Sequence, residues 1–99
     1  MTLDEFLNHA AQADAPPGKL SDVLQSLWYA ERGNWDRAHQ IAQDIPSPDG
    51  SWVHAYLHRE EGDDGNAGYW YARAHRTPST QSLVKERHAI IKTLLRDEE

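Results

Sequence analysis

The chain has 99 residues, no cysteine and a formal net charge of −6, from 16 acidic and 10 basic residues. This length suits one domain with one core, and the lack of cysteine excludes disulfides, thiolate metal sites and cysteine nucleophiles. The negative charge and the scattered basic residues argue against nucleic acid as a partner, because phosphates attract cationic surfaces. The acidic start MTLDEFLNHAA carries no long apolar run, so we expect neither a signal peptide nor a membrane span, and a cytoplasmic protein.

Helical periodicity runs through almost the whole chain and is interrupted by short turn sequences. Thr2 and Glu5 have the spacing of a capping box, which marks the start of the first helix. Paired prolines in the sequence DAPPG end that helix, because proline cannot continue one. No segment alternates like a strand, so we expect an all-α fold of about six short helices. The apolar positions predict helices over about 3–13, 20–33, 35–46, 51–62, 66–78 and 79–96.

Polar residues at the predicted helix starts are typical N-caps. Asn34 precedes the third helix, Ser51 the fourth and Asn66 the fifth, and each offers a side-chain oxygen to a free backbone N–H. The sequence PSPDG at 46–50 is predicted to be a loop. The predicted connections between helices are short, and short connections favour an antiparallel arrangement of consecutive helices.

An internal repeat organises the middle of the chain. The sequence GNWDRA at 33–38 aligns with GDDGNA 29 residues later, and the apolar positions on either side align in the same register. The alignment predicts two helix–turn–helix units, at about 20–46 and 50–78, within a single domain of residues 1–99. In each unit, glycine closes the first helix with a positive φ, and alanine lets the second helix approach closely.

The repeated turn resembles the G-D-Y-x-x-A elbow of tetratricopeptide repeats, and residues 62–78 also match the aromatic, alanine and proline positions that follow this elbow. The likeness covers about 20–78 and extends to the related Sel1-like repeats. The units are shorter than the family's, and His58 and His54 stand where the family has an aromatic residue and leucine. Either this helix is rotated relative to its orientation in the family, or its contact surface with the neighbouring helix is unusually polar. The HAYLHR and YWY sequences are also similar to those of small uncharacterised bacterial proteins, a likeness that implies no activity.

The resemblance implies antiparallel helical hairpins with right-handed stacking. It also implies a non-enzymatic protein-interaction module or scaffold that binds a protein or peptide. By analogy with the family, the first helix of each unit lines a groove, which makes Trp52, Tyr56 and Arg59 candidate partner contacts. A homodimer is a further option, because an exposed remainder of the apolar last helix would favour one.

A second candidate surface lies on the predicted fifth helix. Tyr69, Arg73 and Arg76 have spacings of four and seven, which align them on one face, opposite Trp70. A tyrosine flanked by two guanidinium groups is suited to a carboxylate or an aromatic partner. The alternative is a solvated face on which arginine side chains lie over the tyrosine ring.

Two histidines of the predicted fourth helix are the candidate ligand site. His54 and His58 lie one turn apart, and Glu61 follows on the same arc, so two imidazoles and a carboxylate are available to a divalent metal or a small ligand. The alternative is a pair of histidines hydrogen-bonded at a helix seam. A small-ligand or metal-binding protein using His54, His58 and Arg59, with a catalytic role as an option, is therefore the alternative to the interaction module.

Other sequence features point away from catalysis. The serines fall mainly at predicted caps, and the sequence GDDGNAG lacks both the lysine of a phosphate-binding loop and a preceding strand. We therefore predict no enzyme, no catalytic residue and no cofactor.

Overall fold

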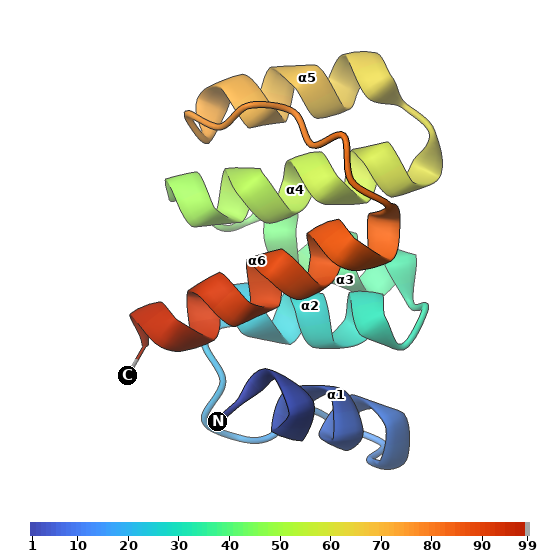
Figure 1. Ribbon diagram of the computed structural model, residues 1–99, viewed down its shortest axis with the longest axis vertical. Helices are drawn as coiled ribbons and strands as arrows, with labels where there is room; N and C mark the ends of the chain where they lie inside the picture. The colour runs from blue at the N-terminus through green and yellow to red at the C-terminus, as the bar shows by residue number, and fades with distance from the viewer. Residues whose placement is uncertain (99) are drawn as a thin grey trace.

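Six α-helices and no strand make up residues 1–98, the part of the chain that the computed structural model describes (Figure 1). The prediction of an all-α fold with six helices is confirmed for this range. None of the helices combines the length and the apolar character that crossing a bilayer requires, as judged over the same residues. The helices are α1 (Leu3–Gln12), α2 (Asp22–Glu31), α3 (Trp35–Gln43), α4 (Pro48–Glu61), α5 (Asp64–Arg73) and α6 (Leu83–Asp97).

The helix starts confirm two of the four predicted caps. Thr2 and Glu5 form a complete capping box at α1, and the side chain of Asn34 accepts a hydrogen bond from the third residue of α3. However, α4 is capped by Ser47 rather than Ser51, and α5 by Asp63 rather than Asn66. The predicted loop at 46–50 therefore contains the first turn of α4.

Proline explains the early start of α4. Pro48 occupies the first position of the helix, where its missing N–H is not needed and its fixed φ suits the helix. By contrast, α6 starts later than the predicted residue 79. Ser82 is its N-cap, and the stretch between α5 and α6 is irregular.

The two glycines of the repeated turn behave as predicted. Gly33 has a φ of 81° and Gly62 a φ of 91°, and both follow the first helix of a predicted unit. A left-handed residue at this position favours glycine, because a Cβ atom would meet the following carbonyl group. These two positions end α2 and α4 and direct the chain into α3 and α5.

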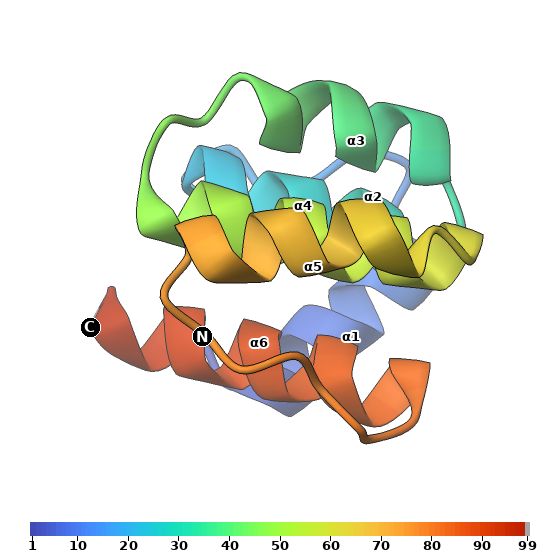
Figure 2. The same cartoon turned by 90° about the horizontal axis from the view of Figure 1, so that it is seen from above.

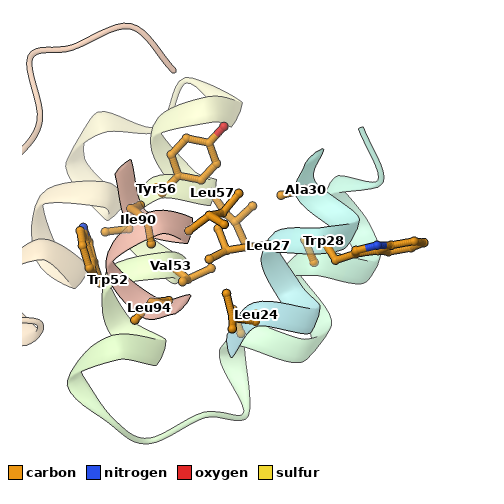
Figure 3. Packing of buried hydrophobic residues seen from close by; sticks show 14 of the residues in the cluster. Leu24, Leu27, Trp28, Ala30, Trp52, Val53, Tyr56, Leu57, Ile90 and Leu94 are labelled. Atoms are coloured by element: carbon orange, nitrogen blue, oxygen red, sulfur yellow. The ribbon is translucent and has the colours of Figure 1, made fainter. Parts of the chain in front are cut away.

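Helix α6 packs across α2 and α4, and it also contacts α1 (Figure 1). Figure 2 shows α6 on the side of α2 and α4 that faces away from α3. The core lies where these helices meet. Figure 3 shows side chains of α2, α4 and α6 packed together there, namely Leu24, Leu27, Val53, Leu57, Ile90 and Leu94.

Two ionic networks attach α6 to the helices beneath it. The carboxylate of Glu86, with only 3% of the residue exposed, accepts hydrogen bonds from Arg59 of α4 at 2.9 Å and from the hydroxyl of Tyr71 in α5. The second network connects α6 to α2, because the carboxylate of Glu31 binds Arg87 at 2.8 Å and His88 at 2.7 Å. His88 is half-buried at this helix contact.

Helix α1 is attached to α2 through polar contacts around a buried ring. The indole Nε1 of Trp28 donates to Nδ1 of His9 at 3.0 Å, and Trp28 itself is fully buried. The guanidinium of Arg32 lies over the same indole, 5.0 Å from its centre, and donates to the backbone carbonyl of Ala10 at the end of α1. Helix α1 therefore covers one end of the core.

Candidate functional site

Three histidines meet at the contact between α3 and α4. His39 comes from α3, and His54 and His58 from successive turns of α4. One nitrogen atom from each imidazole lies within 4.8 Å of the other two, and Nε2 of His54 is 3.0 Å from Nε2 of His39. His54 and His58 are buried, and His39 is half-buried. The histidine face of α4 therefore packs against α3, and His54 is hydrogen-bonded to His39 across this contact.

The carboxylate of Glu61 sets the tautomer of one imidazole. Its Oε1 lies 2.8 Å from Nδ1 of His58, and an ionised carboxylate only accepts hydrogen bonds. Nδ1 of His58 therefore carries a proton, which leaves the lone pair of the neutral ring on Nε2. The predicted grouping of His54, His58 and Glu61 is thus only partly realised, because Glu61 binds the far side of His58.

Two tryptophans hold the imidazole rings in place. Trp35 stacks on His39 with ring centres 4.7 Å apart, and Trp70 stacks on His54 with centres 4.0 Å apart. The indole Nε1 of Trp35 also donates to the carbonyl of Leu57 at 2.7 Å, which fixes that ring between α3 and α4. Stacking and hydrogen bonding together restrict the orientations that the imidazoles can adopt.

Burial favours the neutral form of His54 and of His39. Burial, together with repulsion of the charged form by the neighbouring rings of His58 and His39, lowers the pKa of His54 to about 4. Burial also lowers the pKa of His39, and His58 adds to this effect, whereas Glu61 and Asp36 oppose it. His39 and His54 therefore face each other without charge at neutral pH, and their close contact needs only one shared proton.

We expect acid to destabilise the metal-free protein through His54. An unfolded histidine titrates near pH 6.5, whereas His54 titrates near 4 in the folded chain, so the unfolded state binds more protons between these values. Stability is therefore lost as pH falls from 6.5 towards 4, by about 2 kcal/mol between pH 7 and pH 5. Urea unfolding with a chelator present measures this loss, and His54→Gln is expected to reduce it. Equal losses in both proteins would contradict the assignment.

Sequence reasoning did not find His39. A local signal was present, because Trp35 and His39 are four residues apart and therefore lie on one face of α3. What the sequence did not provide is the contact between this face of α3 and the histidine face of α4. That contact depends on how the two helices pack.

The three residues predicted to share one face of α5 do not lie together in the structure. Tyr69 is 54% exposed, and Nη1 of Arg73 donates to its hydroxyl at 3.3 Å while the guanidinium lies 5.4 Å from the centre of the Trp70 ring. Arg76 does not continue this face, since α5 ends at Arg73 and the chain turns at His75, which has a φ of 59°. The two arginines therefore occupy different local surroundings.

Arg76 covers a tryptophan of α4 instead. Its guanidinium lies 3.4 Å from the centre of the Trp52 ring, and Trp52 is 8% exposed. Both residues line an open cleft of about 510 Å³ between the 75–81 segment and α6. Trp52 was predicted to be a partner contact, and the structure leaves it only the edge of this cleft.

The other two predicted groove contacts are not free surface residues. Tyr56 is fully buried, and its hydroxyl accepts a hydrogen bond from Arg87 of α6 at 2.9 Å. Arg59 binds Glu86 of the same helix. The predicted surface position of Tyr56 is therefore incorrect. The sequence analysis placed both residues on the correct face of α4, but α6 covers this face.

No protein-family model, curated protein or solved structure shows a significant match to this chain. The resemblance to tetratricopeptide repeats stays a prediction, and the functional argument depends on the geometry of the chain itself.

Proposed function

We propose that the chain is a non-enzymatic protein-interaction module whose partner supplies an acidic segment. In this proposal α2 with α3 and α4 with α5 form antiparallel hairpins that stack with the right-handed sense of tetratricopeptide repeats. The packing of α2 on α3, of α4 on α5 and of α3 on α4 supports it, as do the left-handed glycines that follow α2 and α4. In the repeat family the groove between first helices receives the partner. Here α6 occupies that face, so the partner binds elsewhere.

The observation that carries this proposal is a pair of arginines stacked on aromatic rings without a carboxylate partner. Arg73 lies over Trp70 beside the exposed Tyr69, and Arg76 lies over Trp52. Within residues 1–98, neither guanidinium is within 4.0 Å of a carboxylate oxygen, whereas Arg59 and Arg87 both form salt bridges.

Charge complementarity selects an acidic partner. The whole chain has a net charge of −6, whereas Arg73 at the end of α5 and Arg76 in the segment that follows each offer a guanidinium without a carboxylate partner among the described residues. Glutamate or aspartate side chains would bind the guanidinium groups, and an aromatic side chain would pack against Tyr69. Trp70 and Trp52 support the arginines from below, which lowers the entropy lost when they bind.

Titration with a synthetic peptide that alternates glutamate with tyrosine tests the proposal. We expect binding that weakens with added salt and that decreases about tenfold in the double variant Arg73→Gln with Arg76→Gln. The matched control is Lys85→Gln with Lys92→Gln, which removes the same charge from exposed positions of α6 and should leave affinity unchanged. Absence of binding, or an equal loss in both variants, would overturn the proposal.

A further inference from the structure

The geometry points to a transition-metal site formed by three histidines, which we propose binds one divalent ion through His39, His54 and His58. Zinc is the ion that fits best. This inference does not depend on the acidic partner proposed above, because its ligands are histidines rather than arginines, although Trp70 contacts both His54 and Arg73.

The spacing of the three rings suits a single ion. Zinc binds imidazole nitrogen at about 2.0–2.1 Å, so two nitrogens of one tetrahedral site lie roughly 3.3 Å apart. Nε2 of His54 and Nε2 of His39 are 3.0 Å apart, and all three histidines have a nitrogen within 4.8 Å of the others. The His58 ring lies 4.7 Å from that of His54 and 5.2 Å from that of His39. A movement of the His58 side chain towards the other two rings would complete the tripod.

The protonation pattern also suits a metal. Metal ions bind neutral imidazole through its lone pair, and the three rings are supplied by two helices, His39 by α3 and the other two by α4. In the contact between His39 and His54, one nitrogen must donate a proton to the other. A bound cation would replace this proton and use both lone pairs.

Glu61 supports the three-histidine site without being one of its ligands. Its carboxylate accepts the Nδ1 proton of His58 and so leaves Nε2 as the nitrogen with a lone pair for a metal ion. Histidine ligands in metal sites regularly have such a carboxylate partner, which fixes the ring and raises its basicity. We therefore assign Glu61 as a positioning residue and not as a ligand.

The donor set determines the class of metal. Three imidazoles favour zinc, copper, nickel or cobalt over magnesium and calcium, which prefer oxygen. A second group of possible ligands, His58, Glu61 and Asp63, is more exposed and richer in oxygen. It is the weaker candidate, because Asp63 already caps α5 and Glu61 already binds His58. Three protein ligands leave a fourth position for water or for a group from a partner.

Calorimetric titration of the chelator-stripped full chain with zinc sulfate tests this site. We expect one ion per chain, micromolar or tighter affinity, and a melting temperature that rises with zinc concentration, because the ion binds only the folded state. His39→Gln is expected to weaken binding by at least about 100-fold. This variant should fold, since His39 is half-buried, and circular dichroism checks that it does.

Two control variants separate this site from adsorption to surface histidines. His75→Gln removes an exposed histidine outside the cluster and should leave zinc affinity unchanged. Glu61→Gln should weaken binding by about tenfold while the melting temperature without metal changes little, because this residue acts through the orientation of His58. Lack of zinc binding by the original chain, an equal loss in His75→Gln, or wild-type affinity in a folded His39→Gln protein would overturn the proposal.

Discussion

Replacement of Arg59 by methionine is expected to lower the free energy of unfolding by about 3–4 kcal/mol. Glu86 is almost fully buried, and Arg59 is its only cationic partner among the described residues. Methionine keeps most of the side-chain volume but leaves a buried carboxylate with only the hydroxyl of Tyr71 as a donor. Arg59 also donates to the backbone carbonyl of Gln81, so the variant would loosen the start of α6 as well.

Urea unfolding of the variant, with a double-mutant cycle, measures this effect. In the double variant Arg59→Met with Glu86→Leu no charge stays buried, and we expect much of the lost stability to return. The surface control is Arg73→Met, which removes an exposed arginine one helix away and should change stability by less than about 0.5 kcal/mol. A loss as small as that of the control would show that Glu86 is solvated or protonated, and would contradict the network.

The ion pair between Arg59 and Glu86 also shows which kind of contact could not be predicted from the sequence. The resemblance to tetratricopeptide repeats predicted Arg59 as a partner contact, because the first helix of each unit lines the groove in that family. Its actual partner, Glu86, is 27 residues away and belongs to a helix whose position no local pattern determines. The prediction expected a partner protein on the face of α4 that carries Arg59. In the structure α6 of the same chain lies on that face.

The elements themselves were predictable because their signals are local. Apolar spacing, glycine turns and N-cap residues act within one or two turns of helix, and they indicated all six helices. The errors at helix starts were also local. At α4, Ser47 followed by Pro48 is a capping sequence that was interpreted as a loop. At α5, Asp63 took the role predicted for Asn66, because the helix starts directly after the left-handed Gly62.

The cluster of His39, His54 and His58 was predictable only in part. The pairing of His54 with His58 follows from helix geometry, since residues four apart share a face. His39 joins them only because α3 packs on α4, and that packing is determined at the turn between the two helices. Gly50, in the first turn of α4, lies against Ile45 of the connection from α3, and this contact offers a test of the turn.

Gly50→Ala is expected to lower the free energy of unfolding by about 3 kcal/mol. A Cβ atom at Gly50 would lie 2.5 Å from the backbone oxygen of Ile45 and 2.6 Å from its Cγ2 atom, distances too short for any unstrained contact. Because one of these atoms belongs to the backbone, no side-chain rotation relieves the overlap. The first turn of α4 must move away from the end of α3, which also moves His54 relative to His39.

Gly68→Ala provides the matched comparison and should have the opposite sign. Gly68 lies within α5, and an added Cβ would have no atom within 4 Å. Alanine is the better helix former, so this variant is expected to gain roughly 0.5–1 kcal/mol. Thermal melts should therefore show Gly50→Ala lowered by about 10–20 °C and Gly68→Ala raised by a few degrees. If both glycines tolerate alanine equally, the close contact between Gly50 and Ile45 is absent in solution.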